Sequence, residues 1–365
     1  MATLAPVTAT HAFDERRLAD YLRACGLPEF AGGLTALQYQ GGQSNPTYRL
    51  EAGGRYFVLR KKPPGDLLPS AHLVEREYRV MKALADTDVP VPKMIHLCED
   101  TGVIGQAFFV MEYVDGRVPT APGLPEIDSP DERAAIYDAM NEALARLHSV
   151  DWRAIGLGDY GKPSDYVARQ TSVWTRQYEA ARTDPIPAME ALVEWLPANT
   201  PAGDASKKET TIAHGDYRLD NMILHPTEPR VLAIVDWELS TLGHPLADLA
   251  YNCMTYHLPE GPLWKGLGEI DCGALGIPSE EEYVAAYCRR TERAGVPDWE
   301  FFMAFGLFRL AAICQGVYAR AIQGNASSRN ALEVGAKAPM LAEAGWDFAR
   351  RARASPGAPE PARDA

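Results

Sequence analysis

The sequence IAHGDYRLDNMILHP, residues 212–226, sets polar side chains between two apolar runs. The runs at 212–213 and 222–224 have the composition of short buried strands. The residues between them include three charged side chains, an imidazole and an amide. Binding and catalytic residues are concentrated in loops held by a rigid scaffold. The stretch therefore predicts a functional loop between two strands.

A second polar position follows at the end of the next apolar run, VLAIVD, residues 231–236. The turn HPTEPR predicts a hairpin that returns Asp236 to the side of Asn221. A carboxylate and an amide oxygen placed together can bind a hard cation such as Mg²⁺. A further carboxylate, Asp216, can orient or deprotonate a hydroxyl group. A metal site beside a positioned base is typical of phosphoryl transfer.

Composition limits the function further. The 365 residues carry a net charge of −13, which argues against a nucleic-acid-binding surface as the main function. The six cysteines form no CxxC pair, so neither a zinc site nor a redox motif is indicated, and scattered thiols fit a reducing cytoplasm. The most apolar window, from Phe301, contains Arg309 and predicts a buried helix instead of a membrane span. We expect a cytoplasmic protein without nucleic-acid or membrane partners.

The predicted elements change character along the chain. A first helix over about 13–25 is followed by strands broken at glycine pairs, a helix over about 71–85 and a strand pair around Gly102. From Ser129 onward helices dominate, and Ser129 and Pro130 provide a helix start. The expected fold is α+β, with a small β-rich lobe at 1–114 and a larger, mostly helical lobe at 115–350. The Pro-, Ala- and Gly-rich residues 351–365 predict a disordered tail.

The motifs HGDYRLDN and IVDWE resemble the catalytic loop and metal-binding motif of the aminoglycoside phosphotransferase and choline kinase family, which is related to protein kinases. GGQSNPTYRL, REYRVMKAL, VPVP, FFVMEYVDGR and GHPLADLAY resemble the subgroup fused to some acyl-CoA dehydrogenases. The resemblance spans about residues 32–350. It implies a two-lobed protein-kinase-like fold and ATP with Mg²⁺ as cofactors. It also implies Asp216 as the base, with Asn221 and Asp236 as metal ligands.

The resemblance also implies a buried ion pair at the nucleotide phosphates. Glu77 lies within the apolar stripe of the helix at 71–85, and a carboxylate there needs a cationic partner. Strand alternation places Val58 and Arg60 on one face and Leu59 and Lys61 on the other. Arg60 stands where protein kinases have lysine. We prefer Arg60 to Lys62 as the partner of Glu77, and both remain open.

Two backbone segments complete the expected nucleotide site. Gly41 and Gly42 permit close approach to phosphate, while Ser44 and Asn45 add hydrogen-bond donors. The segment VMEYVDG resembles the hinge of kinases, where the backbone at Glu112 and Val114 would meet the adenine edge.

Several neighbouring residues have structural interpretations. We expect His214 to brace the catalytic loop, Asp248 to support that loop from the following helix, and Trp237 to pack. His225 and His244 are interpreted as loop residues, not metal ligands.

Three functions compete. The first is a small-molecule kinase, a phosphotransferase with an alcohol group as acceptor. The others are a non-catalytic pseudokinase, suggested by Arg60 and the irregular glycine loop, and a dinuclear metal phosphoesterase, which the missing His-rich motifs oppose. For the kinase, the subgroup resemblance implies a hydroxyacyl-CoA or hydroxy acid as acceptor, and an aminoglycoside or other amino alcohol is the alternative. An anionic acceptor needs cations, for which the chain offers Arg169, Arg176, Arg218, Arg309 and Arg320. Arg218 is preferred because it follows the base by two residues.

Overall fold

The computed structural model describes residues 3–40, 45–65, 72–261, 265–324 and 330–354. Contacts divide the chain into two compact units. Unit 1 comprises Met1–Thr120, Arg153–Leu157 and Leu219–Ser240, and unit 2 comprises Ala121–Trp152, Gly158–Arg218 and Thr241–Ala365. These units are defined by contacts, so the predicted lobes at 1–114 and 115–350 stay a prediction. Leu219–Ser240, which begins within the HGDYRLDN motif, packs with the β-rich part of the chain.

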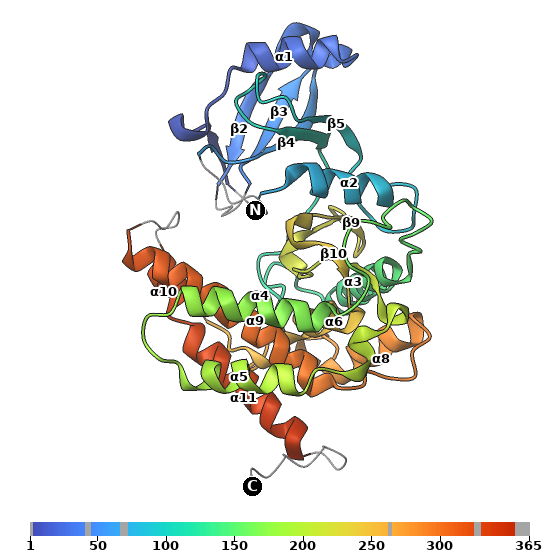
Figure 1. Cartoon of the computed structure of the whole chain (residues 1–365). Helices are drawn as coiled ribbons and strands as arrows, with labels where there is room; N and C mark the ends of the chain where they lie inside the picture. Colours follow the sequence, from blue (N-terminus) through green and yellow to red (C-terminus); the bar gives the residue numbers. More distant parts are fainter. Residues whose placement is uncertain (1–2, 41–44, 66–71, 262–264, 325–329, 355–365) are drawn as a thin grey trace. The chain divides into compact units, whose positions relative to one another are not determined.

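Unit 1 is built on an antiparallel sheet whose six strands lie in the order β1-β2-β3-β4-β6-β5 within the described residues (Figure 1). The strands are β1 (Leu4–Pro6), β2 (Thr35–Tyr39), β3 (Thr47–Ala52), β4 (Arg55–Lys61), β5 (Met94–Cys98) and β6 (Phe108–Glu112). The turn at Gly53 and Gly54, both with positive φ, joins β3 to β4 as the glycine pair predicts. The short strand β1 was not predicted, and it pairs with β2 at the sheet edge.

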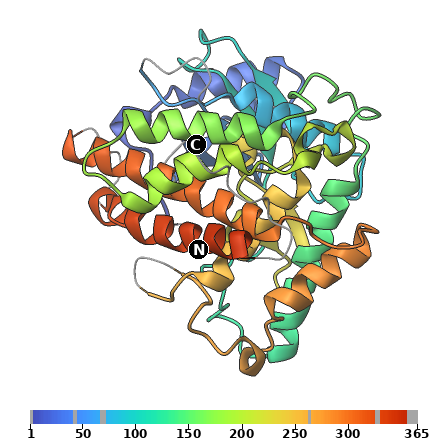
Figure 2. The ribbon, with the colours of Figure 1, turned by 60° about the horizontal axis from the view of Figure 1, so that its bottom comes forward.

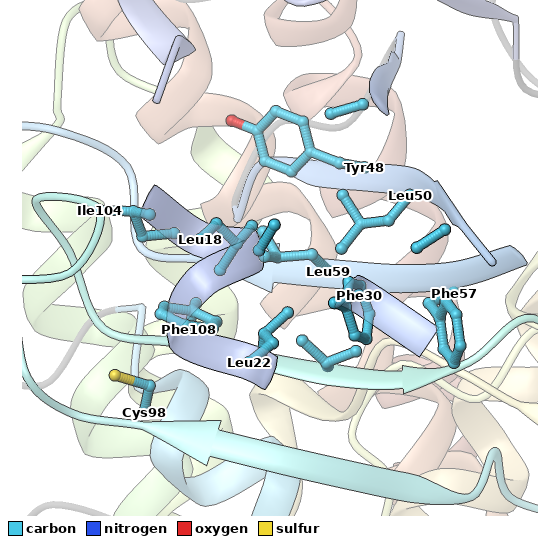
Figure 3. Close-up of a cluster of buried hydrophobic side chains, with 14 of the residues drawn as sticks. Leu18, Leu22, Phe30, Tyr48, Leu50, Phe57, Leu59, Cys98, Ile104 and Phe108 are labelled. Atoms are coloured by element: carbon cyan, nitrogen blue, oxygen red, sulfur yellow. The ribbon is translucent and has the colours of Figure 1, made fainter. Parts of the chain in front are cut away.

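Side-chain alternation gives the sheet two different faces. One face packs against α1 (Glu15–Ala24), and the apolar cluster in Figure 3 lies between them, with Leu18 and Leu22 from the helix and Leu50, Phe57 and Leu59 from the sheet. Val58 and Arg60 of β4 point to the opposite face, which lines a cavity. The predicted alternation of β4 is therefore confirmed. Burial of the first face stabilises the sheet, and the second face is the one that lines a cavity able to hold a ligand.

Other elements of unit 1 lie beside the cavity face. They are α2 (Val74–Leu84) and the hairpin of β8 (Met222–Leu224) with β9 (Val231–Ile234). Gly116 is required where the chain leaves β6, because a Cβ atom there would lie 2.3 Å from the carbonyl oxygen of Leu224. Arg117 and Leu224 exchange backbone hydrogen bonds of 2.8 and 2.7 Å at this contact. The segment after β6 is thus tied to β8.

Unit 2 is mostly helical. Its helices are α3 (Pro130–Ser149), α4 (Tyr166–Ala180), α5 (Pro187–Ala198), α6 (Pro245–Cys253), α7 (Cys272–Leu275), α8 (Glu280–Arg290), α9 (Trp299–Ile322), α10 (Ala331–Gly335) and α11 (Ala338–Ala354). Helices α4, α5, α9 and α11 pack side by side (Figure 2). The pair of β7 (Thr211–Ala213) with β10 (Thr241–Gly243) lies beside α3, α4 and α6.

Helix α9 is the central helix of this packing. By length and composition it could cross a membrane, but 78% of its apolar window is buried inside the protein. This burial agrees with the prediction of a core helix around Arg309. Helix α11 continues through Ala354, so residues 351–354 of the predicted tail are helical, and residues 355–365 lie outside the described part. The unbroken run of helix formers before Pro356 explains the longer helix.

Candidate functional site

A cavity of about 410 Å³ opens on the polar face of the unit 1 sheet. It is lined by one side of the sheet, by α2, by the segment after β6 and by the β8–β9 hairpin. Its lining includes Val58, Arg60, Glu77, Phe109, Met111, Glu112, Val114, Asn221 and Asp236. Six of the residues predicted from sequence for a nucleotide and metal site therefore line one cavity. The apolar lining residues, such as Val58, Phe109 and Met111, can cover a flat ring, and the charged lining residues can contact phosphates.

Arg60 is the centre of the charged cluster in this cavity. Its Nε lies 3.1 and 3.2 Å from the two carboxylate oxygens of Glu77, and its Nη2 lies 2.6 Å from Oδ1 of Asp236. Nη2 is also 3.4 Å from Oε2 of Glu238. Lys62, the alternative partner, pairs instead with Glu75 at 2.7 Å. Of the two cations, Arg60 is the partner of Glu77.

Burial sets the charge balance of this cluster. Glu77 is 1% exposed, and burial raises its pKa to about 7 against the opposing effect of Arg60. Burial also disfavours the charged guanidinium of Arg60, but Glu77, Asp236 and Glu238 outweigh it and hold the pKa of Arg60 above its ordinary value. Arg60 therefore stays charged, and its positive charge partly offsets the negative charges of Glu77, Asp236 and Glu238.

Asn45, two residues before β3, supports this ion pair. Its amide nitrogen donates to Glu77 Oε1 at 2.9 Å, and its Oδ1 lies 3.1 Å from Nδ1 of His72. The side chain is 4% exposed and both of its ends contact protein groups. This differs from the direct phosphate contact expected from the sequence. Gly41, Gly42 and Ser44 lie outside the described residues.

The predicted hairpin brings Asn221 and Asp236 into one cavity. The backbone N–H of Val235 donates to the carbonyl of Asn221 at 2.9 Å, which continues the β8–β9 ladder. Asp236 has φ 67° and ψ 58°, a left-handed conformation that aspartate tolerates better than most residues. Trp237 then packs fully buried, as predicted, with its indole N–H donating to Ile234 at 2.9 Å. This turn leaves the Asp236 carboxylate 34% exposed at the cavity.

One carboxylate and one amide oxygen fit a particular kind of metal site. Mg²⁺ keeps several waters and binds through one or two carboxylates together with substrate phosphates. Within the described ranges no group of three His, Cys, Asp or Glu residues is arranged to hold a metal. The donor set therefore suits a metal that arrives with a nucleotide.

Backbone groups after β6 are available at the other end of the cavity. The backbone N–H of Glu112 donates to the carbonyl of Lys93 at 2.9 Å, so it is already used. In the part of the chain that the structure describes, the backbone N–H and C=O of Val114 have no hydrogen-bond partner. Unpaired backbone groups that are partly buried favour a ligand with matching polar edges. Val114 thus meets the expectation for a hinge contact better than Glu112.

The catalytic-loop motif begins in unit 2, where Asp248 holds its backbone. The two carboxylate oxygens of Asp248 accept the N–H groups of His214 at 2.5 Å and Gly215 at 2.9 Å. Nδ1 of the buried His214 in turn accepts the N–H of Asp216 at 3.2 Å. Both supporting roles expected from the sequence are confirmed. These hydrogen bonds fix the backbone of residues 214–216 independently of the Asp216 side chain.

Asp216 lies among cationic and hydroxyl groups of unit 2. Its Oδ1 is 3.1 Å from Nε of Arg218, and the hydroxyl of Tyr251 hydrogen-bonds to it. Burial would raise the pKa of Asp216, but Arg218, Tyr251, His214 and Arg309 together hold it below its ordinary value. The carboxylate is ionised at neutral pH and can accept a hydrogen bond from a hydroxyl.

Two participants, Glu238 and Tyr251, were missed by sequence reasoning. Glu238 joins Arg60 because the turn after Asp236 carries it back, and Tyr251 reaches Asp216 from α6. Tyr251 is the last residue of the motif GHPLADLAY, so this motif could have indicated that Tyr251 belongs to the site. The contribution of Asn45 to Glu77 had no signal in the local sequence.

Comparisons with known proteins agree with this geometry. Residues 35–304 match the model of a group described as "Phosphotransferase enzyme family". The chain is 48% identical over 347 residues to acyl-CoA dehydrogenase family member 10 of Mus musculus, covering 95% of this chain and 32% of that protein. It spans less than half the length of the curated relatives it matches.

Solved structures give the same result for the fold. A protein from Ralstonia eutropha JMP134, described as "a putative aminoglycoside phosphotransferase", is 50% identical with a TM-score of 0.84, covering 93% of this chain and 99% of that chain. Choline kinase from Cryptosporidium parvum has a TM-score of 0.65 at 11% identity, covering 93% and 96%. A mutant of APH(4)-Ia solved with ADP and hygromycin B has a TM-score of 0.58 at 16% identity, covering 89% and 97%. The predicted two-lobed protein-kinase-like α+β fold is confirmed.

Proposed function

Because the chain belongs to the phosphotransferase enzyme family, we propose that it moves the γ-phosphoryl group of ATP to the hydroxyl of a small acyl compound. The observation that carries this proposal is the cluster in which Arg60 contacts both Glu77 and Asp236 within one cavity. A cation flanked by carboxylates is suited to exchange one of them for phosphate oxygens when a nucleotide and its metal enter.

Each part of the cavity has a role in this proposal. The backbone of Val114 would meet the adenine edge, and Arg60 would contact the phosphates while Glu77 holds it. Asn221 and Asp236 would hold Mg²⁺. When bound there, the metal supplies positive charge beside the β- and γ-phosphates. The fit of the donor set to a metal that arrives with ATP supports this assignment.

Asp216 would orient the acceptor hydroxyl and accept its proton. A carboxylate of low pKa is a weak general base, but phosphoryl transfer depends mostly on positioning and electrostatic stabilisation. Its ionised state and the rigid loop that carries it support such a role. Arg218, paired with Asp216, would keep the carboxylate in place and ionised.

The proposed acceptor class is a hydroxyacyl-CoA or the corresponding hydroxy acid. It is supported by the identity of 48% to a protein named for acyl-CoA dehydrogenation, a name that concerns acyl thioesters. An aminoglycoside is the second candidate. The name of the 50% identical structure and the net charge of −13, which attracts polycations, favour that alternative.

A side-by-side assay separates the candidates. ADP formation is measured with ATP and Mg²⁺ in the presence of a 4-hydroxyacyl-CoA, the free 4-hydroxy acid or kanamycin. Stimulation of ADP formation by the acyl compounds supports the proposal, whereas stimulation by kanamycin alone would identify an aminoglycoside as the acceptor. ATP binding without turnover on any acceptor would favour the pseudokinase.

A further inference from the structure

Arg309 is a buried cation that has no hydrogen-bond acceptor among the described residues. The residue is 6% exposed in the middle of α9, and its Nε–H is buried without a partner. Throughout the ranges that the structure describes, no carboxylate lies within 4 Å of its guanidinium. A buried charge is costly unless hydrogen bonds satisfy it, so an unsatisfied guanidinium needs an explanation.

Two aromatic rings hold this guanidinium in place. Its Cζ lies 5.5 Å from the ring centre of Trp174 on α4 and 5.2 Å from that of Tyr251 on α6. Ring faces attract a cation but leave its in-plane N–H groups without acceptors. Trp174 is partly exposed, so the group lies just beneath the protein surface. The two rings therefore hold the guanidinium without accepting its N–H donors.

The same guanidinium acts electrostatically on Asp216. Arg309 contributes to lowering the pKa of that carboxyl, and Tyr251 contacts both residues. All four residues, Trp174, Asp216, Tyr251 and Arg309, belong to unit 2. Tyr251 thus links the Asp216 carboxylate to the Arg309 guanidinium, so a ligand that reaches both would pair its hydroxyl with the first and a second polar group with the other.

The other cations suggested for the acceptor are less suitable. Arg169 donates to the carbonyl of Lys162 at 2.9 Å, and Arg176 donates to the hydroxyl of Ser172 at 2.6 Å. Arg320 is exposed, and Arg218 is half exposed and already paired with Asp216. Of these five arginines, Arg309 alone is buried with an unsatisfied donor.

We infer that Arg309 recognises the acyl oxygen of the acceptor, as thioester carbonyl or carboxylate, and thereby sets the position of the hydroxyl at Asp216. This inference rests on the proposed function and names its specificity-determining residue. One or two oxygens suffice for the free N–H groups, whereas a doubly charged phosphate would be repelled by Asp216. The aromatic walls suit a short apolar chain between hydroxyl and acyl group.

The test compares Arg309→Met with Arg320→Met, a matched change on the exposed part of the same helix. Acceptors are 4-hydroxypentanoyl-CoA, 4-hydroxypentanoate and 2-pentanol, which lacks the acyl oxygen. In Arg309→Met we expect kcat/KM to fall about 10–100-fold for the acyl acceptors, mostly through KM, and to fall much less for 2-pentanol. Arg320→Met should match the unmodified protein. The acyl acceptor that shows the larger loss of kcat/KM identifies whether Arg309 binds the carboxylate or the thioester carbonyl.

Melting temperature and calorimetric binding of 4-hydroxypentanoate complete the test. Replacing an unsatisfied buried cation by methionine should keep or raise the melting temperature, and Arg309→Lys should recover part of the affinity. Equal losses for all three acceptors would indicate a structural role and overturn the inference, as would unchanged kinetics. A wild-type protein that binds ATP but phosphorylates none of them would overturn the proposed function instead, and the inference with it.

Discussion

Nη2 of Arg60 lies 2.6 Å from Oδ1 of Asp236, although 176 residues separate them in the chain. The contact joins the cation proposed for the phosphates to the carboxylate proposed for the metal. Both side chains line one cavity of unit 1. Nucleotide and metal binding should therefore be coupled through this pair.

Asp236→Asn should abolish most phosphoryl transfer. The substitution keeps the shape of the turn but removes the charge that would neutralise the metal, so we expect kcat to fall at least about 10²–10³-fold at saturating Mg²⁺. Steady-state ADP formation measures the loss, and an unchanged melting temperature verifies the fold. Turnover near that of the unmodified protein would show that Asp236 is not the metal ligand.

Arg60→Lys should weaken the use of ATP without unfolding the protein. Lysine provides a single charged point and cannot bridge Glu77 and Asp236 as the planar guanidinium does. We expect kcat/KM for ATP to fall about 10–100-fold, the size of one or two lost charged hydrogen bonds. Lys62→Ala is the matched control, because Lys62 pairs with Glu75. An equal loss in both variants would contradict the assignment.

Asp216→Asn should separate binding from chemistry. Asparagine keeps the loop geometry but cannot accept the proton, so we expect kcat to fall about 10²–10⁴-fold while the dissociation constant of ATP changes little. Because Arg218 and its neighbours hold the pKa of Asp216 low, the unmodified protein should lose no activity through this group between pH 6 and 8. Collapse of ATP affinity with preserved turnover of bound ATP would mean that Asp216 and Asp236 have exchanged roles.

His244 should make the protein acid-sensitive. Its Nδ1 accepts the N–H of Leu246 at the start of α6, and burial lowers its pKa to about 4 from an ordinary 6.5. The unfolded state therefore binds the proton first, and stability should be lost as pH falls from 6.5 to 4, by about 3 kcal/mol in total. His244→Asn retains an acceptor for the helix start but does not titrate. Urea unfolding at several pH values should show a smaller decline in this variant, and an equal decline would exclude His244 as the cause.

Local patterns predicted much of the cavity. Period-two alternation is a property of the strand itself, so the face of Arg60 followed from the sequence of β4. The hairpin between Asn221 and Asp236 followed from two short apolar runs and a turn. In each case the contact depends on a few neighbouring residues.

Other parts of the site depend on the tertiary structure. Glu238 reaches Arg60 only because Asp236 adopts a left-handed conformation, which periodicity does not reveal. Asn45 supports Glu77, where a phosphate contact was expected, because its amide lies beside α2. The surroundings of Arg309 come from α4 and α6, which are distant in sequence, so the apolar window predicted only its burial.

The most direct test of phosphoryl transfer to a hydroxyl is identification of the product by ³¹P NMR and mass spectrometry. The protein is incubated with ATP, Mg²⁺ and 4-hydroxypentanoyl-CoA, and Asp216→Asn is run in parallel. We expect ADP and a new monophosphate ester on the acceptor hydroxyl with the unmodified protein, and almost no such ester with the variant. ATP that remains intact, or ADP formed together with inorganic phosphate while every hydroxyl acceptor stays unmodified, would contradict this expectation.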